Sequence, residues 1–175
     1  MVVLEKLKNN IKIEKIIDIE EHINELVELL IDVVDNGASV GFLSPLEPLE
    51  ATKYWDNVPN PNIIIFVATV NNKIVGSVQL HLCSKQNGEH RAEIAKLMTH
   101  SNYRRHGIGR LLMEKAHETA LQMGRTLLVL DTREGDLSNL LYISLGYNVA
   151  GRIPAYTKSE NGDFEATIIY YKNLV

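Results

Sequence analysis

The chain has 175 residues, of which 45% are hydrophobic and 23% charged, and its formal net charge is −4. These values are typical of one globular domain, residues 1–175, and they argue against a general nucleic-acid-binding protein, which needs a broad basic surface. No apolar run approaches the length that spans a membrane, so we expect no membrane partner and a cytoplasmic location. The only cysteine, Cys83, lies in an alternating apolar run and is expected to be a buried thiol.

The first half of the chain predicts a strand, two helices and the beginning of a sheet. Residues 11–16 form a short strand, and from Ile19 to Val34 apolar side chains recur three and four residues apart, as on one face of a helix. Turn-forming residues follow, and a second short helix is expected to begin near Glu47. Three runs rich in β-branched residues then predict successive antiparallel strands at residues 63–70, 73–83 and 91–99.

The second half alternates helices with strands. A helix beginning at about Gly107 and ending at Gly124 has an apolar stripe made of Ile108, Leu111, Leu112, Ala116, Ala120 and Met123. A short strand ends at Asp131, and a helix follows with Leu137, Leu141 and Leu145 expected to face inward. Two closing strands are predicted at 148–153 and 165–174. The predicted fold class is therefore mixed α/β.

The segment "RRHGIGR", residues 104–110, lies between a strand and a long helix. A helix start exposes unpaired N–H groups, glycines let an anion approach the backbone, and arginines add charged donors, so this segment is a candidate phosphate site. A tight turn alone is the alternative. The phosphate-binding P-loop of NTPases is excluded, because that motif needs a lysine and a hydroxyl residue that do not follow Gly109 at the required spacing. A dinucleotide site is disfavoured because Leu112 stands in the third glycine position and antiparallel hairpins precede the motif.

"RRHGIG", residues 104–109, matches the Q/R-x-x-G-x-G/A signature of the GCN5-related N-acetyltransferases, and "LYISLGY", 141–147, resembles their L-Y-x-x-x-G-F/Y segment. Together with the hairpin order, the similarity covers residues 63–172. "GASVGFL", "VQLHLC", "RAEIAKLM" and "LLVLDT" further resemble tabtoxin-resistance acetyltransferases. The resemblance implies an α+β fold with one mostly antiparallel sheet, splayed between its fourth and fifth strands and flanked by helices.

The resemblance also implies acetyl-CoA as cofactor and a direct transfer of its acetyl group to an amine. Its pyrophosphate is expected on the loop and helix start, at Arg104, Arg105, His106, Gly107, Ile108, Gly109 and Arg110. The pantetheine chain is expected to pair like a strand with Leu97, Met98 and Thr99. Gly135 stands where many relatives have an asparagine, and Asn139, one helical turn before Tyr142, is the alternative cofactor contact. No histidines are spaced as metal ligands, so no metal is expected.

A lysine-like amine must lose a proton before it reacts, at a cost of roughly 4 to 5 kcal/mol at neutral pH, and the leaving thiolate needs a proton. Glu93, in an apolar strand, and Asp131, at the end of a buried strand next to the site, are candidates to hold a water that accepts the amine proton. Either can instead be an ordinary ion-paired or turn-capping carboxylate. Tyr142 matches the family's general-acid position, although an aromatic residue there can also be a packing residue.

The acceptor is expected to bind between segments 35–55 and 154–164. Its candidate contacts are Asp35, Ser39, Phe42, Trp55 and Tyr156, each of which can also be a surface or core residue. The carboxylates favour a cationic amine, and the resemblance implies a small molecule such as a toxin, an antibiotic or an amino-acid-like compound. A protein N-acetyltransferase and a non-catalytic acyl-CoA-binding module are the alternatives. A homodimer is left open.

Overall fold

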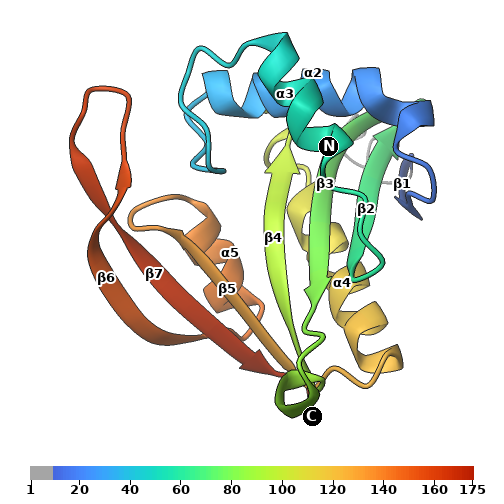
Figure 1. Ribbon diagram of the computed structural model, residues 1–175, viewed down its shortest axis with the longest axis vertical. Helices are drawn as coiled ribbons and strands as arrows, with labels where there is room; N and C mark the ends of the chain where they lie inside the picture. The colour runs from blue at the N-terminus through green and yellow to red at the C-terminus, as the bar shows by residue number, and fades with distance from the viewer. Residues whose placement is uncertain (1–9) are drawn as a thin grey trace.

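The computed structural model describes residues 10–175. Seven strands form one sheet in the order β1-β2-β3-β4-β5-β7-β6, and Figure 1 shows that it is open and twisted. Neighbouring strands are antiparallel except β4 and β5, which are parallel. The strands are β1 (Ile11–Lys15), β2 (Ile63–Val70), β3 (Lys73–Leu82), β4 (Arg91–Thr99), β5 (Leu127–Arg133), β6 (Asn148–Lys158) and β7 (Phe164–Asn173).

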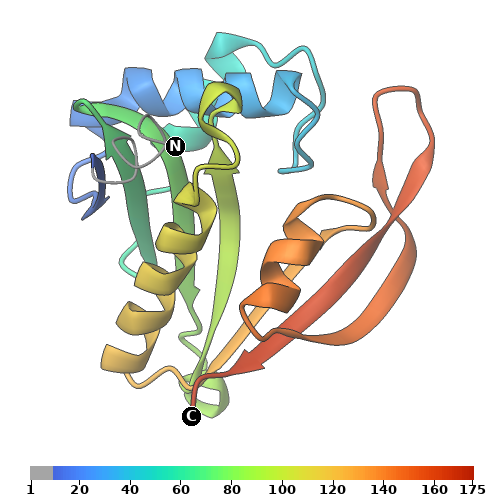
Figure 2. The same ribbon diagram turned by 180° about the vertical axis from the view of Figure 1, so that it is seen from behind.

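Four α-helices and three short 3-10 turns complete the fold. The helices are α2 (Ile23–Asp35), α3 (Pro48–Asp56), α4 (Ile108–Gln122) and α5 (Ser138–Ser144), and the turns are η1 (Glu20–His22), η2 (Gln86–Gly88) and η3 (Ser101–Tyr103). One core cluster joins α2 and α3 to one face of the sheet, and a second joins α4 to the other face. In Figure 2, which views the molecule from behind, α4 lies in front of β2, β3 and β4, and α5 lies beside β5.

The sheet splits between its two parallel strands. Pairing between β4 and β5 covers only Arg91–Glu93 with Leu127–Val129, and beyond these residues the strands diverge as a V in Figures 1 and 2. In both views the loop between α2 and α3 descends toward the opening. The splay predicted between the fourth and fifth strands is confirmed. It leaves the edge of β4 from residue 94 onward without a strand partner.

A β-bulge interrupts β4 within this free edge. Ala95 pairs with Gln79, but the next pair is Met98 with Ser77, so two residues of β4 oppose one of β3. Lys96, in the bulge, has a φ of 50°, a conformation that costs most residues energy. Because the bulge shifts the alternation by one residue, Met98 belongs to the core cluster under α2 and α3, whereas Leu97 packs on the α4 side. Strict alternation along the strand would put Leu97 on the same face as Glu93, and the bulge moves it to the opposite face.

The order of elements agrees with the sequence predictions, but three surface assignments do not. Leu137 is 70% exposed and precedes α5 as its N-cap rather than facing the core. Leu111 on α4 and its C-cap Met123 are exposed, because the buried stripe of the helix consists of Ile108, Leu112, Met113, Ala116, His117 and Ala120. Cys83 follows β3 and is half-buried, not buried.

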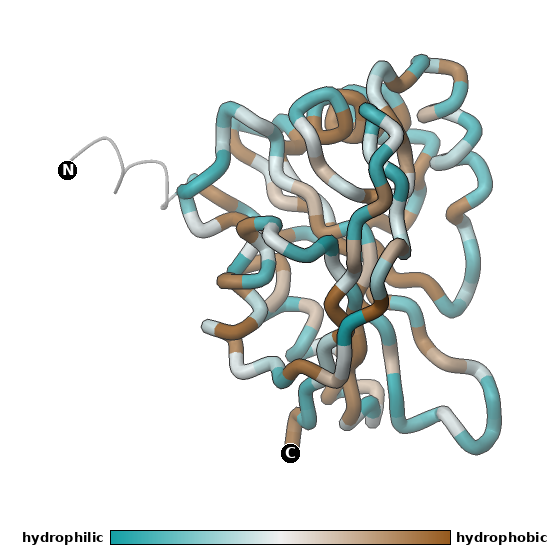
Figure 3. Tube along the Cα trace, turned by 90° about the vertical axis from the view of Figure 1, so that its left-hand side faces the viewer, coloured by the Kyte–Doolittle hydropathy of each residue, from teal (hydrophilic) through white to brown (hydrophobic). Residues whose placement is uncertain are grey.

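The β6–β7 side, facing the viewer in Figure 3, mixes hydrophilic and hydrophobic residues along its length.

No helix within residues 10–175 has both the length and the apolar character needed to cross a bilayer.

Candidate active site

A cavity of about 790 Å³ fills the V between β4 and β5. The α2–α3 loop, the free half of β4, the start of α4, the end of β5 and the start of α5 all contribute to its wall. Twelve of the fourteen site residues predicted from the sequence line it: Glu93, Leu97, Met98, Thr99, Arg104, Arg105, Gly107, Ile108, Gly109, Arg110, Asp131 and Tyr142. The fold thus brings together segments that are nearly 50 residues apart in the chain.

His106 and Asn139 are the two predicted residues that do not line this cavity. The side chain of His106 turns inward, and its Nδ1 is buried without a partner among the described residues. Asn139 donates to the carbonyl oxygens of Arg133 and Asp136, and its Oδ1 accepts a hydrogen bond from the Tyr170 hydroxyl. The amide of Asn139 is therefore fully used in holding α5 against β5 and β7, and the expected cofactor contact from this side chain is not supported.

The start of α4 presents backbone N–H groups that no side chain caps. Gly107 is the N-cap with a φ of 83°, no side chain caps the helix, and Arg105 also has a positive φ of 67°. The first N–H groups of the helix consequently have no intrahelical partner, and successive N–H groups in such conformations form a concave anion site. Arg104 and Arg105 lie exposed beside it, and Arg110 is held by a hydrogen bond to the Ser144 hydroxyl.

The second glycine of the motif serves a different purpose. A Cβ on Gly109 would lie 3.3 Å from Cδ2 of Leu141 and 4.0 Å from both Cδ2 of Leu97 and Oγ1 of Thr99. A larger residue would therefore push apart α4, α5 and β4 at the floor of the cavity. Gly107, in contrast, has open space around its Cβ position. Gly107 supplies the left-handed conformation, and Gly109 supplies the close approach.

The free edge of β4 ends beside this helix start. The backbone groups of Leu97, Met98 and Thr99 that face the gap have no strand partner, because β5 pairs with β4 only as far as Glu93. An extended chain with amide groups can occupy such an edge as an added strand. The pantetheine arm of acetyl-CoA has this chemistry, so the edge and the α4 start together fit the cofactor.

Glu93 and Asp131 project into the cavity from adjacent parallel strands. Burial raises the pKa of the Glu93 carboxyl, the nearby Asp131 raises this pKa further, and Lys96 opposes both effects. Asp131 is fixed by a hydrogen bond of 3.0 Å from the hydroxyl of Thr167, on β7. The Asp131 carboxylate therefore acts electrostatically on Glu93, and both side chains line the same cavity.

Tyr142 is buried on α5, with only 6% of its surface exposed. Its ring packs against Tyr147 and Tyr170, with centroid distances of 5.8 and 5.9 Å. Burial raises the pKa of its hydroxyl, and Asp131 raises it further. A tyrosine hydroxyl is protonated at neutral pH even without this shift, and Tyr142 lines the cavity, so a protonated hydroxyl is present there.

Sequence reasoning missed an arginine that spans the cavity. Arg133, the last residue of β5, donates from Nη2 to the carbonyl of Gly37 in the α2–α3 loop at 2.9 Å. It also forms ion pairs with Asp136 and with Glu165, at 2.8 and 3.2 Å. Arg133 thus links the α2–α3 loop to β5 and β7 across the cavity. The one signal in the sequence for this role is that Arg133 lies two residues after Asp131 on the same strand, and alternate residues of a strand point to the same face.

The acceptor candidates divide into two groups. Ser39 and Tyr156 line the cavity. Trp55 is fully buried, and its indole donates to the Leu26 carbonyl, while Asp35 accepts bonds from the Ser44 hydroxyl and the Leu46 amide. Trp55 and Asp35 therefore hold the α2–α3 region together and are not placed to contact an acceptor. Phe42 lies behind the wall, edge-on to Tyr54 at 5.4 Å.

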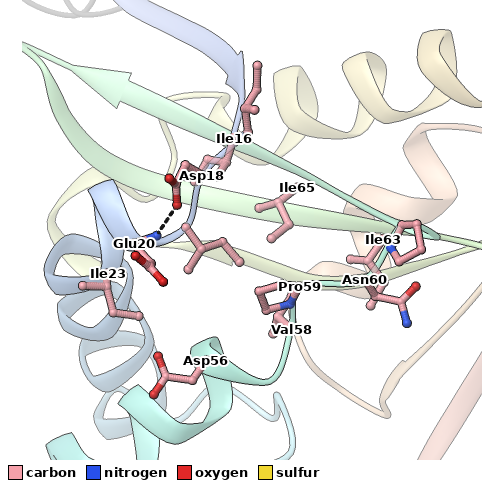
Figure 4. Close-up of a pocket in the computed structure, with 13 residues that line it drawn as sticks. Ile16, Asp18, Glu20, Ile23, Asp56, Val58, Pro59, Asn60, Ile63 and Ile65 are labelled. Atoms are coloured by element: carbon pink, nitrogen blue, oxygen red, sulfur yellow. Dashed lines mark hydrogen bonds between the residues drawn. The ribbon is translucent and has the colours of Figure 1, made fainter.

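A second cavity, of about 650 Å³, lies at the other end of the molecule, between β1, η1 and α3 (Figure 4). Among residues 10–175, its wall is made of isoleucines, Val58, two prolines and Asn60 with the carboxylates of Asp18, Glu20 and Asp56, and it includes no lysine or arginine. In Figure 4 Asp18 accepts a hydrogen bond from the backbone of Glu20. The three carboxylates disfavour a phosphate group here. Within residues 10–175, no three His, Cys, Asp or Glu side chains are grouped as metal ligands.

Comparison with known proteins supports the cofactor assignment. Among solved structures, an N-acetyltransferase from Staphylococcus aureus is 17% identical, with a TM-score of 0.80 over 95% of this chain and 99% of that one. Ribosomal-protein-alanine N-acetyltransferase from Brucella melitensis is 19% identical, with a TM-score of 0.77 over 93% and 99%. A protein from Salmonella typhimurium, 15% identical with a TM-score of 0.77 over 95% of both chains, was solved with its cofactor acetyl-CoA.

At these identities the solved structures show the fold, and the family is shown by sequence. Residues 20–147 match the model of the acetyltransferase (GNAT) family, and members of this family use acetyl-CoA. The matched segment includes the bulged strand, the α4 start and Tyr142. The chain belongs to the GNAT acetyltransferase family.

Proposed function

We propose that this protein is an N-acetyltransferase that moves the acetyl group of acetyl-CoA directly to the primary amine of a small molecule. The observation that carries the proposal is the convergence of Glu93, Asp131 and Tyr142 in one cavity with the α4 start and the free β4 edge. A protein that only bound acyl-CoA would need the last two features and not the first three.

The roles follow from the surroundings of each side chain. Acetyl-CoA supplies an activated acyl group as a thioester. Glu93 and Asp131 hold a water that takes the proton of the acceptor ammonium, so that the neutral nitrogen attacks the thioester carbonyl. Tyr142 gives its proton to the departing thiolate. One N–C bond forms and one C–S bond breaks, and the second proton lost by the nitrogen restores the Tyr142 hydroxyl. The products are the N-acetylated amine, CoA with a free thiol, and one proton.

A direct transfer is favoured over an acetylated enzyme intermediate. The only cysteine of the chain, Cys83, lies beyond the end of β3 and does not line the cavity. A cysteine-based relay would need that thiol beside the thioester. With no cysteine in the cavity, we propose that the acceptor amine reaches the thioester while acetyl-CoA is bound.

The Arg133–Gly37 hydrogen bond supports a small acceptor. An extended polypeptide entering between the halves of the sheet would have to displace this bond and the ion pairs of Arg133. A toxin, antibiotic or amino-acid-like amine remains our proposal. Acetylation of a protein is the alternative, since the structure from Brucella melitensis is named a ribosomal-protein-alanine N-acetyltransferase.

The test is amine-dependent release of free CoA thiol from acetyl-CoA, with a panel of small amines, amino acids and peptides. We expect turnover with at least one small amine, and mass spectrometry should show the product larger by one acetyl group. Binding of acetyl-CoA without turnover by any amine would make the protein a non-catalytic binding module. Faster turnover with peptides than with small amines would favour the protein acetyltransferase.

A further inference from the structure

Lys96 lines the part of the cavity that also contains Glu93 and Asp131, away from the α4 start. We call this part the acceptor half of the cavity, and the Lys96 ammonium group is held in a fixed position there. Its Nζ donates a hydrogen bond to the Val40 carbonyl and lies 5.6 Å from the ring centroid of Phe42 and 5.3 Å from that of Tyr54. Tyr54 is itself fixed by a hydrogen bond from Gln79 at 2.8 Å. Two aromatic faces and a carbonyl oxygen favour an ammonium ion at this point. The bulge of β4 therefore directs Lys96 to a prepared position.

The charge of Lys96 has no direct partner among residues 10–175. No carboxylate oxygen lies within 4.0 Å of its Nζ, whereas Arg133, which lines the same cavity, is paired with Asp136 and Glu165. An ammonium group has three N–H donors, and only one of them is used here. The remaining basic residues of the wall, Arg104, Arg105 and Arg110, lie at the start of α4, on the cofactor side.

Glu93 and Asp131 are close enough to Lys96 to act on it, since both raise its pKa against the larger lowering by burial. The acceptor half of the cavity thus offers two carboxylates and one unpaired ammonium. A simple cationic amine satisfies the carboxylates but is repelled by Lys96. An amine that also carries a carboxylate satisfies all three groups.

We propose that Lys96 binds an oxyanion of the acceptor, and that the acceptor is an amino acid or a closely related amine with a free carboxylate. This inference rests on the proposed acetyltransferase activity, and it assigns a specificity role to a residue outside the proton-transfer set. Lys96 holds the carboxylate end of the acceptor while the amine end lies at Glu93 and Asp131.

The experiment compares amino acids with their amides and with the corresponding decarboxylated amines, for wild type, Lys96→Met and Lys115→Met. Lys115 is a surface lysine of α4, paired with Glu118, and serves as the matched control. We expect wild type to prefer the acids, and Lys96→Met to lower kcat/KM for them about 10- to 100-fold, mainly through KM, as for a lost hydrogen bond to a charged group. Activity with the amides should be unchanged or higher, and Lys115→Met should match wild type.

Equal activity of wild type with acids and amides would overturn the proposal. An equal loss with both in Lys96→Met would do the same, since Lys96 would then be a structural residue. If Lys96→Met does not fold, Phe42→Leu, which removes one ring and keeps the charge, should still raise KM for the acids alone, and an equal change for the amides would refute the assignment.

Binding separates this inference from the proposed function. Calorimetry of amino acids added to the wild-type complex with CoA needs no turnover. If no amine is acetylated but acids bind to this complex, and lose affinity in Lys96→Met, the proposed activity fails and the Lys96 site stands. If amines without a carboxylate are acetylated and acids neither bind nor react, the activity stands and the Lys96 site fails.

Discussion

The start of α4 gives the sharpest test of cofactor binding, through Gly107→Glu. Gly107 has a φ of 83° and open space at its Cβ position, so a side chain causes no clash but does cost the left-handed conformation, about 1–2 kcal/mol. For a chain of this length the melting temperature should fall by about 2–8 °C. The carboxylate would also face the pyrophosphate. At about 4 Å and an effective dielectric constant of about 20, two unit charges repel by about 4 kcal/mol, which predicts a loss of about 10³-fold in CoA affinity.

The helix provides its own control at the other end. Gly124 follows α4, has a φ of 72° and has no atom within 4 Å of its Cβ position. Gly124→Glu should therefore have a similar effect on the melting temperature, measured by calorimetry. It should leave CoA affinity, measured by titration calorimetry, within about twofold of wild type, a change of about 0.4 kcal/mol. Equal CoA affinities for the Gly107 and Gly124 variants would refute the assignment of the α4 start as the pyrophosphate site.

Three further predictions concern the chemistry. Tyr142→Phe should retain CoA affinity within a few-fold but lower kcat about 10- to 10⁴-fold, as for a lost general acid, and equal losses of binding and turnover would make Tyr142 a packing residue. The acid limb of the pH profile of kcat/KM should lie above the usual pKa range of a glutamate, because Glu93 has a raised pKa and loses its proton at higher pH. Asp131→Asn should move this limb to lower pH, because it removes a charge that raises the pKa of Glu93. An unmoved limb would show that Asp131 does not influence the titrating group. Cys83→Ser should leave steady-state rates unchanged, and a loss of turnover would contradict direct transfer.

The sequence predicted the order of elements because each one carries a strong local pattern. The buried stripe of α4, from Ile108 to Ala120, and the Gly107 start are local features, and the family motifs placed them in the fold. Glu93 and Asp131 were predicted from their positions in strands, and Tyr142 was predicted from its position in a family motif. The order of the elements was enough to bring these positions into one cavity. These parts of the site could be predicted because local patterns and short motifs in the sequence identify them.

The misplaced residues depend on tertiary contacts that no short window contains. The bulge at Lys96 shifts the alternation of β4, so Leu97 changes face, and a period of two cannot predict this. Asn139 is captured by Tyr170, 31 residues away. The hydrogen bond from Arg133 to Gly37 joins residues 96 positions apart. Lys96 was visible only as a charge in an apolar strand, and its significance came from Phe42 and Tyr54, on other elements.

The central claim is that Glu93 and Asp131 together form the proton-accepting site of an acetyl transfer in the β4–β5 cavity. A double-mutant cycle with Glu93→Gln and Asp131→Asn, followed by CoA release at saturating acetyl-CoA, tests it most directly. Each single change should lower kcat/KM, and the double change should cost much less than the product of the two, because residues that act as a unit are non-additive. Fully multiplicative losses confined to KM would contradict the claim and show two independent attractors of a cationic acceptor.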